Sequence, residues 1–148
     1  MLLSHRTSVN IRPEYSNIIG HMCYAASKLW NVCNYERRRY KELELEKYPD
    51  WYYQKKAHKG DLWYRQLPSQ TAQETCKQLD KAWKSFYVLK KTVGIKDPNP
   101  PRFKQDNIPI TYMQMGIQHE KGSDQLRLSL SNDLKSYMEE AYGIHEKF

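Results

Sequence analysis

The sequence lacks the patterns that mark exported proteins, membrane proteins and zinc-binding modules. It has only three cysteines, Cys23, Cys33 and Cys76, with no CxxC pair and no Cys/His cluster, so we expect neither a disulfide framework nor a zinc site. The short apolar start is not a signal peptide, and no apolar run approaches the ~18 residues of a membrane span. These absences predict a cytoplasmic protein with no membrane partner.

Catalytic motifs are absent as well. The five histidines have no mutual spacing that is typical of metal ligation. Glu139 and Glu140 are adjacent on a predicted helix, where neighbouring side chains diverge by about 100° and do not converge on one atom. The sequence contains no GxxxxGK[ST] loop for phosphates. We therefore expect no catalytic residues, no metal and no cofactor in this chain by itself.

Positive charge is what the chain has in excess. The formal net charge of its 148 residues is +7. Residues 1–60 carry 11 Lys and Arg against 6 Asp and Glu, residues 61–105 carry 9 against 4, and residues 106–148 carry 4 against 7. A basic surface attracts polyanions, so nucleic acid is the leading partner, and solvated helix faces are the alternative.

The first half of the chain is predicted to be mainly helical. Residues 2–12 alternate loosely in polarity, which predicts a strand. Apolar residues then recur at steps of three and four from Pro13 to about Tyr48, which predicts one long helix. Its opposite side collects Lys28, Arg38 and Lys41, flanked by Arg37 and Arg39. Residues 51–60 are interpreted as a short helix or an ordered loop.

The clearest helix is predicted from Ser69, a candidate N-cap, to Gly94. Its apolar stripe, predicted to face the core, consists of Ala72, Cys76, Leu79, Trp83 and Phe86. A second face, about 135° away, collects Lys77, Lys81, Lys84 and Lys91. A solvated face and a phosphate-binding face are equally open for this lysine stripe.

The last third of the chain changes to strand-like alternation. Residues 96–107 form a proline-rich connector, and Ile110, Tyr112 and residues 126–130 then follow a period of two. Residues 132–142 predict a final helix, with Gly143 just beyond it. Because strand 2–12 needs partners that exist only after residue 107, we predict an α+β fold with a helical block, residues 13–95, inserted between a first strand, residues 1–12, and returning strands, residues 96–148.

Four short pieces of the sequence occur together in an order that resembles a known family. They are Leu29-Trp30-Asn31 with Asn34 and Arg38, then Leu67-Pro68-Ser69-Gln70, then residues 79–86 (LDKAWKSF), and last Pro101-Arg102-Phe103-Lys104. This order resembles the N-terminal region of TnpB, also called OrfB, which prokaryotic insertion sequences encode. The resemblance covers about residues 2–130. Pro100 is a departure, since the family commonly has an apolar or aromatic residue there.

The resemblance implies a fold and a function. TnpB proteins are RNA-guided DNA endonucleases related to type V CRISPR effectors. Their N-terminal half inserts a helical recognition domain after the first strand of a small wedge β-barrel, and it binds guide RNA and double-stranded target DNA. Their RuvC-like catalytic half, with its magnesium-binding acidic residues and zinc module, has no counterpart in residues 1–148. The implied function is therefore the nucleic-acid-binding part alone. A nuclease-less DNA-binding regulator and an interaction subunit for a separate catalytic chain are the alternatives.

The resemblance also implies individual site residues. Ser69, Gln70 and Gln73 match the helix start that approaches the DNA motif in relatives, and Tyr112 and Gln114 match a strand that also nears it. Glutamine can pair bidentately with adenine in the major groove, although an ordinary capped helix start has the same sequence. The residues suited to backbone phosphates are Arg38, Lys77, Lys81, Lys84, Arg102 and Lys104.

Three further residues of the same motifs are expected to be structural. Trp30 is predicted to lie in the core, and Asn31 is predicted to bond to backbone. Phe103 is predicted to anchor the connector in the core, because Arg102 and Lys104 would point to the other side of an extended chain.

Overall fold

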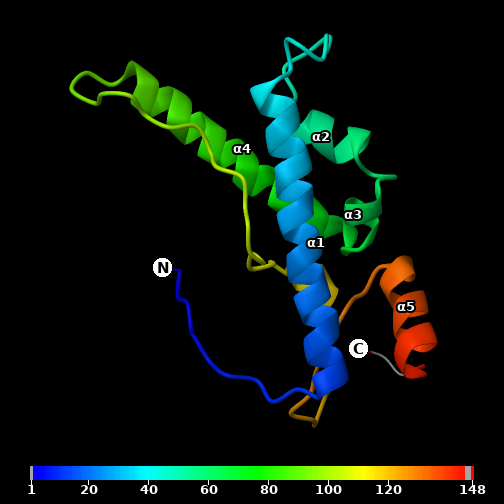
Figure 1. The fold of residues 1–148 in the computed structure, drawn as a ribbon. Helices are drawn as coiled ribbons and strands as arrows, with labels where there is room; N and C mark the ends of the chain where they lie inside the picture. Colours follow the sequence, from blue (N-terminus) through cyan, green and yellow to red (C-terminus); the bar gives the residue numbers. More distant parts are fainter. Residues whose placement is uncertain (1, 146–147) are drawn as a thin grey trace.

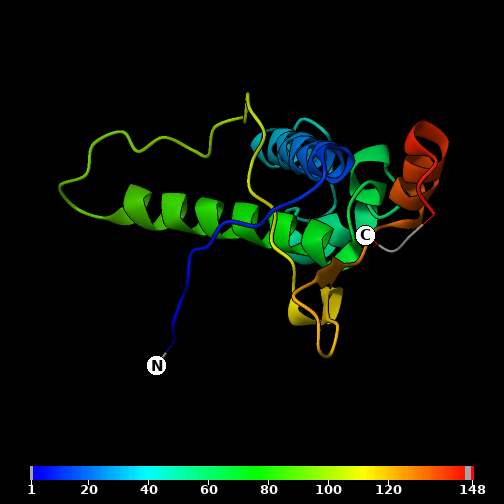
Figure 2. The ribbon, with the colours of Figure 1, turned by 90° about the horizontal axis from the view of Figure 1, so that it is seen from below.

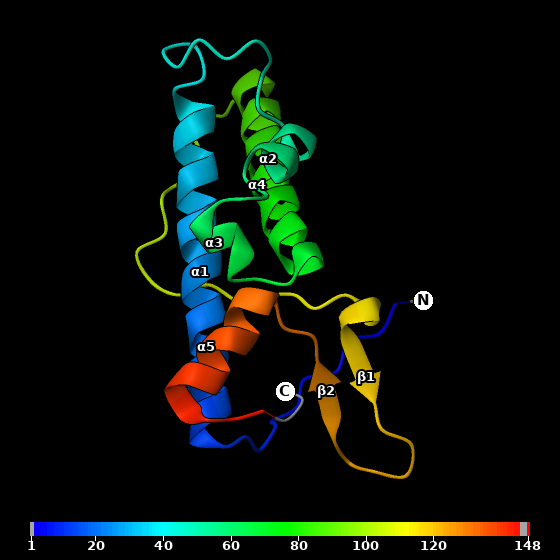
Figure 3. The same ribbon diagram turned by 90° about the vertical axis from the view of Figure 1, so that its right-hand side faces the viewer.

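The computed structural model describes residues 2–145 and 148, and two long helices form its frame. Helix α1 (Pro13–Arg38) crosses α4 (Ser69–Lys91) and packs against it, and the short helices α2 (Trp51–Ala57) and α3 (Leu62–Arg65) cover one side of this pair (Figures 1 and 3). Helix α5 (Asn132–Tyr142) packs beside the first half of α1 (Figure 3). A 3-10 turn, η1 (Gln114–Gly116), leads into a hairpin of β1 (Ile117–His119) and β2 (Leu126–Leu128). The α+β class is confirmed.

The apolar stripes of both long helices are confirmed as core. Ile18, Met22, Ala25, Leu29 and Cys33 of α1 are at most 1% exposed, and they face Ala72, Cys76, Leu79 and Trp83 of α4. Leu134 and Met138 of α5 belong to the same cluster, so one core runs from α4 through α1 to α5. Burial of about a dozen apolar side chains, at roughly 1.5–3 kcal/mol each, drives the folding of the helical frame.

Helix α1 ends earlier than its sequence pattern predicts. It stops at Arg38, and residues 39–44 form turns in which Glu44 adopts a positive φ of 54°. The predicted continuation to Tyr48 is therefore wrong. Residues 41–47 are mainly charged, so a longer helix would have had almost no apolar surface to bury.

The termini of α5 are where the sequence predicts them. Ser131 caps the helix, since its hydroxyl accepts from the Leu134 backbone amide at 3.3 Å. Gly143 ends it in the left-handed conformation with φ 63°, which glycine adopts without a steric penalty. Gly143 was predicted from the sequence to lie just beyond the helix, and the Ser131 cap is an equally local signal.

Residues 2–12 form no strand, and the prediction of a first strand is corrected. They run away from the helices as an extended, exposed arm (Figure 2). A strand needs a ladder of hydrogen bonds to a neighbour, and the segment predicted to supply it is used elsewhere. The backbone amide of Ile108 donates to the Cys23 carbonyl of α1, and the carbonyl of Thr111 accepts from the Thr71 hydroxyl of α4.

The only sheet in residues 2–145 is the antiparallel pair β1–β2, in which Gln118 lies opposite Arg127. The predicted strand at residues 126–130 is thus confirmed over 126–128, and the turn at residues 121–124 connects it to β1. The strand predicted around Ile110 and Tyr112 is irregular chain instead.

Candidate nucleic-acid interface

The start of α4 is open rather than capped by Ser69. The N-cap position belongs to Pro68, and no side chain accepts a hydrogen bond from the first turn. Ser69 is the first helical residue and its side chain is exposed. The prediction of Ser69 as N-cap is therefore wrong by one position, because Pro68, with an extended ψ of 142°, already occupies the turn into the helix.

The two glutamines of the first α4 turns meet the segment before the hairpin. Gln70, Gln73, Glu74 and Lys77 line a cleft of about 300 Å³ together with Gln114 and the two methionines beside it, Met113 and Met115. Gln70 Nε2 lies 3.3 Å from Met115 Sδ, a weak contact that leaves the rest of the amide free to pair. The structure thus brings together three residues predicted to contact the DNA motif, from two segments 41 or more positions apart in the chain.

Tyr112 does not join this cleft. Its hydroxyl donates to the Ser129 carbonyl at 2.7 Å and contacts Met22 Sδ at 3.3 Å, so the ring points between α1 and the hairpin. Burial raises the pKa of its phenol well above the usual value. Tyr112 therefore fixes the position of β2 relative to α1, and its hydroxyl is already used.

The predicted lysine stripe continues from the cleft along α4. Lys77 lies with Nζ 4.8 Å from the Trp51 ring centroid, and Lys81 is exposed on the same face. Lys84 is also exposed, but its Nζ pairs with Asp80 Oδ2 at 2.8 Å. Two of the three predicted phosphate-binding lysines on this stripe, Lys77 and Lys81, thus make no ion pair within residues 2–145.

A second group of predicted residues lies on the connector, on the other side of α1 from α2 and α3 (Figure 1). Four side chains of α1 hold its backbone. Trp30 Nε1 donates to the Arg102 carbonyl at 3.0 Å, and Asn31 exchanges two hydrogen bonds with the Lys104 backbone at 2.7 and 2.8 Å. Asn34 and Arg38 both donate to the Pro101 carbonyl. The predicted roles of Trp30 and Asn31 are confirmed.

The side chains of the connector point outward. Phe103 is 43% exposed, so the prediction that it anchors the core is wrong. Its ring instead lies under the Arg38 guanidinium, 5.0 Å from centroid to Cζ, while Lys104 Nζ lies 4.7 Å from the Trp30 ring centroid. Backbone hydrogen bonds to α1 hold this segment in place of a buried ring, which leaves Arg38, Arg102 and Lys104 as a basic cluster.

A buried polar network behind both surfaces was not predicted from the sequence. Arg37 is 2% exposed and donates to Asp80 Oδ1 at 2.7 Å and to Gln54 Oε1 at 3.0 Å. Burial acts to raise the pKa of Asp80, but hydrogen bonds from Lys84 and Arg37 outweigh it and hold the pKa below its usual value. Three arginines follow one another at residues 37–39, and the signal that could have identified the buried one is spacing. Arg37 lies four residues after Cys33 and therefore continues the apolar stripe.

His58 completes this network and makes it sensitive to pH. It bonds to Glu36 of α1 at 3.2 Å and to Asp61. The hydrogen bond to Glu36 raises the pKa of His58 to about 9 against the opposing effect of burial, and Asp61 adds to the rise. Folding therefore stabilises the protonated form of His58, because the pKa of this histidine in the unfolded chain is about 6.5.

We expect the stability that His58 contributes to be fully present below about pH 6.5 and to be lost as the pH rises through about 9. The melting temperature should fall by roughly 4–8 °C over this range, for a loss of about 2 kcal/mol. His58→Gln should flatten the dependence of the melting temperature on pH between these two values. His145→Gln, at an exposed histidine, should leave that dependence unchanged. Equal slopes for the wild type and His58→Gln would contradict the assignment.

No family model, no curated protein and no solved structure matches the chain. Over the described part of the chain, no helix combines the length and apolar character that a membrane crossing requires. The same residues contain no group of three or more His, Cys, Asp or Glu side chains arranged to hold a metal ion.

Proposed function

We propose that this chain binds nucleic acid, as the guide-RNA- and target-DNA-binding part of an RNA-guided nuclease of the TnpB type. The observation that carries the proposal is the cleft of Gln70, Gln73, Lys77 and Gln114, which places amides suited to base edges next to a lysine suited to phosphates. Residues 1–105, which supply all of these residues except Gln114, carry 20 Lys and Arg against 10 Asp and Glu.

Contacts among three of the four motifs of the resemblance give the proposal further support. The first motif holds the fourth through the bonds of Trp30, Asn31, Asn34 and Arg38 to residues 101–104. The third motif joins the first, since Trp83 Nε1 donates to Asn34 Oδ1 at 2.9 Å. These hydrogen bonds join residues 49 to 73 positions apart, so the first, third and fourth motifs form one connected unit, as residues with a shared structural role would.

The proposal is tested by salt-titrated binding of duplex DNA and of structured RNA to the full chain. We expect log Kd to rise steeply with log salt, and we expect Gln70→Ala with Gln73→Ala to reduce discrimination between duplex sequences by about 10-fold or more with little loss of overall affinity. Lys81→Gln should instead weaken binding to all sequences alike and lower the salt slope by about 1.

The matched control is Gln118→Ala with Gln125→Ala, two exposed glutamines in the hairpin outside the cleft. These substitutions should change neither discrimination nor affinity. Binding no tighter than that of an unrelated protein of equal charge, with a shallow salt slope, would overturn the proposal. Discrimination among duplexes without any RNA affinity would favour the nuclease-less regulator.

A further inference from the structure

Helix α2 presents a set of aromatic rings and lysines that the proposed DNA cleft does not use. Trp51 and Tyr52 are adjacent at its start, with ring centroids 5.8 Å apart and planes at 90°. Tyr52 is 51% exposed, and Trp51 is partly buried against the core. We call Trp51, Tyr52, Lys55, Lys56 and Lys77 the α2 patch.

Three ammonium groups of the patch lie against these two rings. Lys55 Nζ is 4.9 Å from the Trp51 centroid and 4.6 Å from the Tyr52 centroid, and Lys56 Nζ is 4.3 Å from the Tyr52 centroid. Lys77 reaches the Trp51 ring from α4. The α-helical steps of three and four explain this arrangement, since they put Lys55 and Lys56 on the turn above the two rings.

The charge of the patch is not neutralised within the molecule. Lys55, Lys56 and Lys77 make no ion pair with any residue in the ranges 2–145 and 148, whereas Lys84 and Arg37 nearby are paired with Asp80. Asp50 caps α2 through the Tyr53 amide, and Glu74 lies in the cleft. An anion at the patch would therefore meet three cations and an exposed ring.

The patch is also continuous with the cleft. Lys77 touches the Trp51 ring and at the same time lines the cleft beside Gln73. A chain of phosphates that follows Lys77, Lys55 and Lys56 would pass directly over Tyr52. Exposed rings between cations bind polyanions that carry flat aromatic groups, because each base stacks on a ring while its phosphate meets a lysine.

We infer that the α2 patch is a binding site for single-stranded nucleic acid. Lys55 and Lys56 turn from the Tyr52 ring to the phosphates, beside Lys77, and an unpaired base stacks on the ring face that they leave. A duplex keeps its bases stacked inside and offers no free base face to Tyr52. This inference rests on the proposed function and assigns a different ligand to each of the two surfaces. The cleft contacts paired DNA, and the α2 patch contacts the unpaired strand.

The test uses the full chain with uridine and thymidine homopolymers of about 20 nucleotides and a mixed-sequence duplex of similar length. Tyr52→Leu should weaken binding of the single strands about 5- to 100-fold and change duplex binding by less than about twofold. The salt slope should stay the same, because no charge is removed. Tyr52→Phe should retain wild-type affinity, and Lys56→Gln should lower the single-strand slope by about 0.7.

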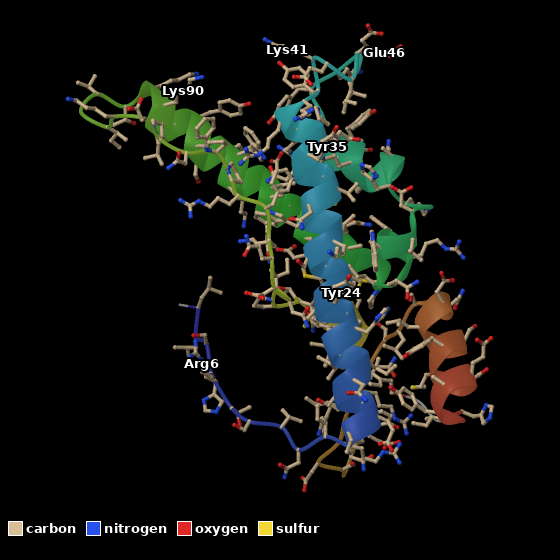
Figure 4. All side chains as sticks on the ribbon, viewed as in Figure 1. Arg6, Tyr24, Tyr35, Lys41, Glu46 and Lys90 are labelled. Atoms are coloured by element: carbon tan, nitrogen blue, oxygen red, sulfur yellow. The ribbon has the colours of Figure 1, made fainter. Side chains whose placement is uncertain are left out.

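The matched control is Tyr35→Leu. Tyr35, labelled on α1 in Figure 4, is 46% exposed and has the Arg39 guanidinium 5.3 Å from its centroid, but it lies outside the cleft and the patch. Its substitution should leave single-strand binding unchanged. If Tyr52→Leu weakens binding of the uridine or the thymidine homopolymer, the result supports the site and identifies which of the two strands it binds.

Three outcomes separate the possibilities. Equal single-strand affinity for Tyr52→Leu, Tyr35→Leu and the wild type overturns the inference, while discrimination by Gln70 and Gln73 among duplexes would leave the proposed function standing. The inference is also overturned if polyglutamate binds with the same affinity as the oligonucleotides and depends equally on Tyr52. The patch would then be a site for an acidic peptide. Absence of binding to every probe overturns both the inference and the proposed function.

Discussion

Arg37→Met should destabilise the fold by about 3 kcal/mol, which lowers the melting temperature by roughly 6–12 °C. Methionine keeps much of the apolar stem of arginine, so the loss reports the guanidinium. Without it, Asp80, which is 4% exposed, keeps only Lys84 and the Trp51 amide as partners, and Gln54 Oε1 loses its donor. A buried carboxylate and a buried amide oxygen would then lie with too few donors. Urea unfolding of the two proteins measures the difference.

Two further variants isolate the cause. Arg39→Met removes an arginine whose pair with Glu42 spans 3.6 Å between side chains more than half exposed, and it should cost less than about 0.5 kcal/mol. Asp80→Asn added to Arg37→Met should restore about 1 kcal/mol or more of the free energy of unfolding, because it removes a buried negative charge that has lost its arginine partner. A loss for Arg37→Met no larger than that for Arg39→Met would contradict the role assigned to the network.

Features that depend on neighbouring residues in the chain were predictable from the sequence. The bounds of α5 follow from a serine hydroxyl at one end and a left-handed glycine at the other, and the core face of α4 follows from spacing alone. The cleft was predictable in part, since Gln70, Gln73 and Lys77 lie within two turns of one helix. That Gln114 would meet them was implied only by the resemblance.

Features that depend on distant partners were not predictable in this way. Residues 2–12 have a strand-like alternation, but alternation does not show whether a neighbouring strand is available to pair with them. Ile108 and Thr111, from the segment expected to pair, form hydrogen bonds with helices instead. Phe103 was predicted to be buried because side chains alternate along an extended chain, which puts Phe103 on the side opposite Arg102 and Lys104. The connector is held instead through its carbonyl groups, which carry no signal in the sequence.

Asn34→Ala should cost about 2–3 kcal/mol and should also loosen the connector. Asn34 is 0% exposed and joins two parts of the molecule, since its oxygen accepts from Trp83 and its amide nitrogen donates to the Pro101 carbonyl at 2.9 Å. Its loss leaves the buried Trp83 Nε1 without an acceptor and leaves Arg38 as the sole side-chain donor to Pro101. Trypsin should then cut after Arg102 and Lys104 about 10-fold faster, because local opening of this segment becomes easier.

Trp83→Phe separates the two effects of Asn34. It removes the indole donor but keeps the bond from Asn34 to Pro101, so it should lower stability without faster cleavage after Arg102 or Lys104. Cleavage after Lys90 and Lys91, at the far end of α4, serves as the internal reference and should stay constant in both variants. If Trp83→Phe accelerates connector cleavage as much as Asn34→Ala does, general destabilisation explains the result. Asn34 would then have no specific role in holding the connector that carries Arg102 and Lys104.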